Sequence, residues 1–163
     1  MKLTGGQALA QQLVREGITD VFGVPGVQLD WSFDGLRRVK DQIKVYVTRH
    51  EQATAYMADG YARTTGRIGV CLMVPGPGLL NASAALATAY ACSSPVLCLT
   101  GQVDSRGIDQ HLGMLHEVPH QLEIMGSFTK WAGRALSPGE IPGLVREASR
   151  QIRSGRPRPA GLE

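Results

Sequence analysis

Residues 43–63, IKVYVTRHEQATAYMADGYAR, decide the fold, because an apolar strand pattern runs directly into a helical one. The strand pattern covers residues 43–47, and a helix rich in small side chains begins at Glu51 and ends near Gly66. Glu51 is therefore expected at a strand-to-helix junction, on the edge of the sheet where open α/β folds bind ligands. The alternative is a charge that only favours the start of a helix.

The same alternation of strands and helices continues along the chain. We expect strands at residues 20–22, 43–47, 68–74, 95–100 and 127–135, and helices at residues 4–15, 28–40, 51–65, 79–92, 118–125 and 137–152. The clearest helix start is Ser137, followed by Pro138 and then by Glu140, which predicts a capping box. Such alternation implies right-handed crossovers and a sheet covered on both faces. We therefore expect a three-layer α/β fold with a mostly parallel sheet of about six strands.

The composition indicates one globular domain over residues 1–163. The chain is 43% hydrophobic and 19% charged, and its net charge of +3 is too slight to argue for nucleic acid. No apolar run approaches the roughly 20 residues that a membrane helix needs. Three cysteines without metal-ligand spacing are expected to be buried thiols in a cytoplasmic protein. The sequence ends as a further strand begins, so we expect a piece of a longer protein.

Glycine-rich turns follow two other strands at the same expected edge. The first turn is GVPG at residues 23–26, whose glycines let the backbone approach a ligand closely. The second is PGPG at residues 75–78, which leads to Asn81. As a dinucleotide fingerprint this second turn is poor, because Asn81 replaces a glycine and the prolines remove backbone donors. Both turns also have a purely structural interpretation, as tight connections between a strand and a helix.

Residues 101–116 show neither helical nor strand periodicity, and we interpret them as a long active-site loop. His116 and His120 have the spacing of a metal pair, but Pro119 between them argues against one helical face, so we expect no metal site. His116 and Gln102 are the candidates for contact with substrate. The alternative for His116 is a solvated loop side chain.

Taken together, these motifs resemble the pyrimidine-binding (PYR) domain at the N-terminus of thiamine-diphosphate-dependent enzymes of the acetolactate synthase type. The resemblance covers essentially the whole chain. Its most specific parts are residues 22–26, 49–52, 57–63, 76–78, 81 and 94–102. It implies that Glu51 is the catalytic residue, which bonds the aminopyrimidine ring of the cofactor and favours its reactive tautomer. It also implies a set of further cofactor contacts: Val24, Pro25, Gly26, Gly76, Gly78 and Asn81.

The resemblance also implies what lies outside this chain. The family binds Mg²⁺ and the diphosphate through a Gly-Asp-Gly motif, which does not occur here, so the chain alone is expected to be inactive. The middle domain, in which FAD would bind, is absent too, and the need for FAD is left open. Pairing of a PYR domain with the diphosphate domain of another subunit implies a homodimer or homotetramer.

We therefore expect the N-terminal domain of an acetolactate synthase-like enzyme, which forms or cleaves carbon–carbon bonds of 2-oxoacids or aldehydes. Leu115-His116-Glu117 stands where acetolactate synthases carry Phe-Gln-Glu, so a 2-oxoacid decarboxylase or an aldehyde lyase on the same scaffold is the alternative. An alternative of another class is a non-catalytic, flavodoxin-like binding module. Such a module has no need of an acid at Glu51.

Overall fold

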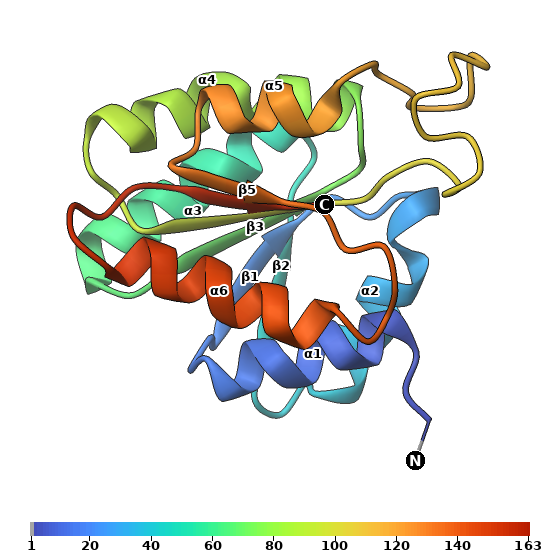
Figure 1. Ribbon diagram of the computed structural model, residues 1–163. Coiled ribbons are helices and arrows are strands. Elements are labelled where there is room, and N and C mark those ends of the chain that lie inside the picture. The colour runs from blue at the N-terminus through green and yellow to red at the C-terminus, as the bar shows by residue number, and fades with distance from the viewer. Residues whose placement is uncertain (1) are drawn as a thin grey trace.

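The computed structural model describes residues 2–163, and its centre is one sheet of six parallel strands in the order β2-β1-β3-β4-β6-β5 (Figure 1). The strands are β1 (Asp20–Gly23), β2 (Lys44–Val47), β3 (Gly69–Met73), β4 (Val96–Thr100), β5 (Trp131–Gly133) and β6 (Ala160–Leu162). Every neighbouring pair is parallel, which confirms the expected sheet. The strand expected at the C-terminal end is β6.

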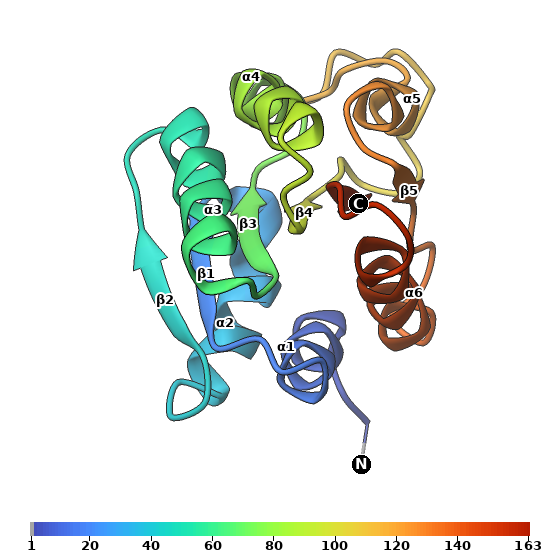
Figure 2. The same ribbon diagram turned by 90° about the vertical axis from the view of Figure 1, so that its left-hand side faces the viewer.

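Helices cover both faces of this sheet (Figure 2). They are α1 (Gly5–Arg15), the short 3₁₀ helix η1 (Val27–Leu29), α2 (Asp30–Arg38), α3 (Glu51–Thr65), α4 (Pro77–Ala91), α5 (Gln121–Ser127) and α6 (Ile141–Arg153). Helices α3, α4 and α5 lie on one face, and α1, α2 and α6 lie on the other. The three-layer α/β architecture is therefore confirmed. Within residues 2–163 no helix has the length and apolarity needed to cross a bilayer.

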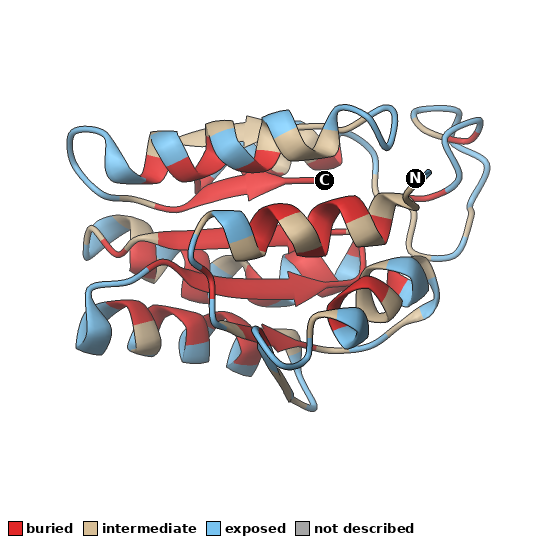
Figure 3. Cartoon of the chain, turned by 90° about the horizontal axis from the view of Figure 1, so that it is seen from below, coloured by how far each residue is buried: buried red, intermediate tan, exposed pale blue. Residues whose placement is uncertain are grey.

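Two apolar cores result, because successive side chains of a strand point to opposite faces of the sheet. On β3, Val70 and Leu72 join the core beneath α1 and α6, whereas Cys71 and Met73 join the core beneath α3 and α4. The central strands are buried along their whole length, as Figure 3 shows. Continuous apolar strands of this kind are typical of parallel sheets that are covered on both sides.

The expected capping box at Ser137 is wrong. Helix α6 begins later, at Ile141, and Pro142 lies in its first turn. The Glu140 carboxylate instead accepts hydrogen bonds from the Leu136 amide (2.9 Å) and the Ser137 hydroxyl (3.0 Å). The Ser137 hydroxyl therefore donates to a side chain and closes a separate turn before the helix.

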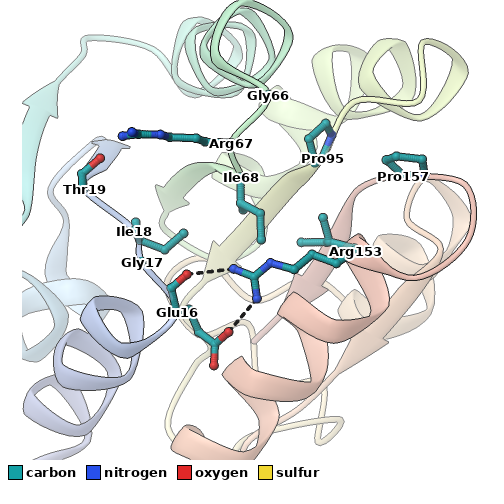
Figure 4. A pocket seen from close by; sticks show the side chains of 11 residues that line it. Glu16, Gly17, Ile18, Thr19, Gly66, Arg67, Ile68, Pro95, Arg153 and Pro157 are labelled. Carbon is teal, nitrogen blue, oxygen red and sulfur yellow. Dashed lines mark hydrogen bonds and ion pairs between the residues drawn. The ribbon is translucent and has the colours of Figure 1, made fainter.

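The edge of the sheet at which the strands begin holds a cavity of about 600 Å³ (Figure 4). Helices α1 and α3 end here, with Glu16 and Gly66 as their C-caps. Arg153 of α6 donates to both the carboxylate and the carbonyl of Glu16, each at 2.8 Å. Free carbonyls give a helix C-terminus a partial negative charge, which suits an arginine. We infer that these Arg153–Glu16 hydrogen bonds connect α6 to the end of α1 and have a structural role.

Helices α1 and α2 approach each other so closely that only glycine fits at their contact. A Cβ on Gly6 would lie 1.6 Å from the Trp31 carbonyl oxygen, and a Cβ on Gly35 would lie 2.1 Å from the Gly6 carbonyl oxygen. Both obstructing atoms belong to the backbone, so neither can move aside without shifting a helix. This contact fixes the distance between the two helices.

Replacing Gly35 by alanine is expected to destabilise the fold by about 1–3 kcal/mol, because the added methyl group overpacks the helix contact. Gly60→Ala in α3 is the matched control, since a Cβ there meets nothing within 4 Å. That control is expected to stabilise the protein by roughly 0.5–1 kcal/mol, as alanine restricts the unfolded chain. Urea unfolding compares the two variants, and equal midpoints would contradict the assignment.

The cysteines differ in accessibility. Cys71 and Cys98 are paired neighbours on β3 and β4, and both are buried. The adjacent Cys98 thiol and burial raise the pKa of Cys71 well above its usual value. Cys92 is exposed, which corrects the expectation of three buried thiols. Cys92 is the C-cap residue that follows α4.

Under native conditions we expect one thiol per chain, that of Cys92, to react rapidly with a chromogenic disulfide reagent. The Cys71 thiol is expected to stay protonated and shielded, and Cys98 shares its buried setting. All three cysteines should react after denaturation. A Cys92→Ser variant that still shows a fast native thiol would overturn this expectation.

Candidate functional site

Helix α3 starts at Glu51, directly beyond the carboxyl end of β2. The preceding residue, His50, is in an extended conformation and is the N-cap, because its Nδ1 accepts a hydrogen bond from the Gln52 amide at 3.1 Å. The Thr48 amide donates to the Gly23 carbonyl at 3.0 Å, which prolongs the pairing of β1 with β2. Glu51 is half-buried and lies at the strand-to-helix junction that the sequence predicted.

Asn81 of α4 lies against Glu51. Its side-chain amide Nδ2 donates to Glu51 Oε2 at 3.0 Å. A Cβ on Gly78 would lie 3.6 Å from the other carboxyl oxygen, Oε1, so the missing side chain leaves room beside the acid. Among residues 2–163, no other group donates a hydrogen bond to the Glu51 carboxyl group. The carboxyl group is therefore held through one oxygen and open at the other.

The PGPG turn takes a conformation that requires glycine at its second position. Gly76 has φ +56° and ψ −113°, outside the regions open to other residues. A Cβ at Gly76 would lie 2.2 Å from the carbonyl oxygen of His116. The Gly76 amide donates to the side chain of Gln121 at 2.6 Å. The turn is thereby packed against the loop on one side and α5 on the other.

The GVPG turn reaches the same place from β1. Val24 in this turn is half-buried and Pro25 is exposed. A Cβ on Gly26 would lie 2.2 Å from Val74 Cγ1, and a Cβ on Gly78 would lie 2.7 Å from Val74 Cγ2. The two turns therefore contact different methyl groups of one side chain, and the PGPG turn also lies against Glu51 at Gly78.

The two loop candidates lie in different places. The carbonyl of His116 packs on Gly76, and its ring nitrogen Nδ1 lies 2.9 Å from Gln28 Oε1, so His116 borders the turns. Gln102 points elsewhere: its Nε2 lies 3.5 Å from Glu163 Oε1, and its Oε1 accepts from the Val103 amide at 2.8 Å. In the described part of the chain, Gln102 makes no hydrogen bond to Glu51 or to either turn.

Gln121 is a buried polar residue beside the PGPG turn that sequence reasoning missed. It is buried and forms three hydrogen bonds: it accepts from the Gly76 amide, and its Nε2 donates to the Gly101 carbonyl (3.1 Å) and to Glu163 Oε2 (2.8 Å). Glu163 also pairs with Arg134. The only signal in the sequence was a glutamine on the inner face of a short helix, which no motif distinguishes.

The comparisons with known proteins agree with this geometry. The sequence pattern of the family described as thiamine pyrophosphate enzyme, N-terminal TPP binding domain, matches residues 3–124. The chain is 40% identical to a probable 2-ketoarginine decarboxylase of Pseudomonas aeruginosa, over 98% of the chain and 28% of that relative. It is 39% identical to an acetolactate synthase of Arthrospira platensis, over 99% of the chain and 28% of the relative.

A probable acetolactate synthase large subunit of Methanocaldococcus jannaschii is 38% identical over 99% of the chain and 26% of the relative. The chain thus spans little more than a quarter of the length of these curated relatives. Almost the whole of this chain is included in each of these matches, and residues 3–124 match the family's N-terminal domain. The chain therefore belongs to the thiamine pyrophosphate enzymes, as a TPP-binding N-terminal domain of the acetolactate synthase-like group.

Proposed function

We propose that Glu51 is the acid that binds and activates the aminopyrimidine ring of thiamine diphosphate. The observation that carries the proposal is its carboxyl group, whose Oε2 is held by Asn81 while Oε1 is open beside Gly78. A carboxyl group fixed in this way can share a proton with a ring nitrogen placed at Oε1. Asn81 would keep the carboxyl group turned toward the ring.

The other residues of the site fit such a ring. The absent side chain of Gly78 leaves room beside Glu51, the His116 carbonyl packs on Gly76, and Val74 supplies an apolar wall between the turns. We propose that Val24, Pro25 and Gly26 border the ring from the other turn. When bound, thiamine diphosphate supplies the carbanion chemistry, and the protein contributes orientation and a proton-sharing acid.

We propose a 2-oxoacid or an aldehyde as the substrate, with His116 as the residue of this chain that meets it. The position of His116 beside the PGPG turn supports this role. Gln102 faces Glu163 and is proposed as a more distant member of the same loop surface. Relatives named as a decarboxylase and as acetolactate synthases match the chain at 40% and 39% identity, so analysis of the product decides between cleavage and synthesis.

We propose that the rest of the active site lies in other domains. The family's metal-binding motif is missing from the sequence, which supports a separate domain for Mg²⁺ and the diphosphate, and any FAD would bind in a middle domain. Side chains on the outer surface of α3 and α4 support pairing in a homodimer or homotetramer: Tyr56, Met57 and Leu80 are 42–43% exposed. The free cysteines support a cytoplasmic location.

The activating role of Glu51 predicts that Glu51→Gln lowers turnover of pyruvate by about 100-fold or more in the full-length enzyme with Mg²⁺ and thiamine diphosphate. Gln52→Asn is the control, because this exposed neighbour lies on the same helix turn. Carbon dioxide and acyloin are measured together, so the product separates a decarboxylase from a synthase. Wild-type turnover in Glu51→Gln would refute the proposed role. Retained cofactor binding without pyruvate turnover in any variant, wild type included, would refute only the substrate.

Gln121→Leu is expected to weaken thiamine diphosphate binding about 10-fold, because it leaves the buried Gly76 amide without its acceptor and removes one of the donors to Glu163. Gln42→Leu makes the same chemical change at an exposed site away from the turns. Titration of the intrinsic fluorescence with cofactor measures the affinity, and thermal unfolding reports any loss of stability. If both variants bind cofactor alike, Gln121 only supports the fold.

A further inference from the structure

Gln28 and His116 are 88 positions apart, yet their side chains form a closed hydrogen-bonded unit at the site. Gln28 lies in η1, directly after the GVPG turn, and its Nε2 donates to the Leu115 carbonyl at 3.0 Å. Its Oε1 lies 2.9 Å from His116 Nδ1. The side-chain amide of Gln28 therefore bonds both the loop backbone at Leu115 and the imidazole ring of His116.

This arrangement determines which nitrogen of His116 carries the proton. The Leu115 carbonyl can only accept, so the amide nitrogen of Gln28 must face it and Oε1 must face the ring. Because Oε1 also only accepts, Nδ1 of His116 must carry a hydrogen. In the neutral ring the other nitrogen, Nε2, then has the free lone pair.

The backbone of His116 is held in place as well as its ring. Its φ is +67°, in the left-handed region that a histidine adopts only at an energetic cost. Such conformations persist where the surroundings enforce them, and they gather at functional sites. Here the carbonyl of His116 fills the space that Gly76 leaves empty. The loop is therefore fixed at His116 from both sides, by Gln28 and by the PGPG turn.

Few charges face this unit. The 3₁₀ helix η1 and the PGPG turn carry no ionisable side chain, and Asp30 follows η1 at the start of α2. Glu117 is the next residue along the loop, and its carboxylate accepts the Met114 amide at 2.8 Å. Glu51 lies on the far side of the turn, against Gly78. Gln28 is the one side chain that bonds the ring of His116 among the described residues.

We propose that Gln28 is a positioning residue that holds His116 as a proton donor to the substrate through Nε2. This inference rests on the proposed function of the site. The protonated ring carries hydrogens on both nitrogens. As the substrate carbonyl carbon gains its new bond, the carbonyl oxygen takes the proton from Nε2, and the ring is left as the Nδ1–H tautomer. Gln28 accepts the same Nδ1–H hydrogen bond before and after the transfer.

The decisive experiment uses two substitutions of Gln28 in the full-length enzyme. Gln28→Leu removes the acceptor, and we expect kcat to fall about 10-fold with cofactor affinity within about 2-fold of wild type. Gln28→Glu restores an acceptor and should recover most of that loss. Gln110→Leu, at an exposed position of the same loop, is the control. If Gln28→Leu has wild-type kcat while Glu51→Gln is inactive, the inference fails and the proposed function stands.

A second readout does not depend on turnover. The rate at which diethyl pyrocarbonate modifies His116, mapped by mass spectrometry, follows the unprotonated ring as pH rises. A carboxylate in Gln28→Glu favours the protonated ring, so the midpoint of this curve should move up by about 1 pH unit. An unchanged midpoint in Gln28→Glu would overturn the inference.

A double-mutant cycle tests whether Gln28 acts only through His116. His116→Gln and the double variant His116→Gln with Gln28→Leu should have the same kcat, because a residue that acts only through His116 has no effect once the ring is gone. Additive losses in the double variant would show that Gln28 acts independently of His116 and would overturn the proposal.

Discussion

Parallel pairing of β1 with both β2 and β3 is the constraint on which the site depends. It brings the ends of three strands to one edge, so the GVPG turn, Glu51 and the PGPG turn become neighbours although up to about 50 positions separate them. Val74 then fixes the spacing, because its two methyl groups touch the positions of Gly26 and Gly78. A larger residue at either glycine would separate the turns and move the acid away from its surroundings.

The sequence was sufficient for the features that follow from periodicity and turn chemistry. Short apolar runs located the strands, and the turn glycines located the edge that carries the site. Glu51 was placed correctly because a strand and a helix with clear periods meet at it. The start of α6 was misplaced, since Ser137 and Glu140 fit a capping box that the structure uses as a separate turn. Local patterns do not record which of two competing hydrogen bonds is formed.

Contacts that depend on tertiary packing could not be predicted. Gln121 joins Gly76, Gly101 and Glu163, and each of these residues comes from a different part of the chain. A buried carboxylate such as Glu163 is stable only where donors surround it, and Arg134 completes that set. The sequence does not indicate which donors will surround the Glu163 carboxylate. The expectation that Cys92 is buried failed for the same reason, because exposure at the end of a helix depends on tertiary packing.

The PGPG turn relates the two proposed roles to each other. Glu51 lies against it at Gly78, and His116 lies against it at Gly76, so one short rigid segment sets the separation between the acid and the imidazole. The side chain of Gln121 bonds Gly76, and the side chain of Gln28 bonds the ring of His116. These hydrogen bonds restrict the movement of the turn and of the ring. In the proposed roles, an acid that serves the cofactor and a ring that serves the substrate would need a fixed relative position, because both would act on one reaction centre. The requirement for glycine at both positions follows from the packing, since a Cβ on Gly76 would overlap the His116 carbonyl and a Cβ on Gly78 would overlap a methyl group of Val74.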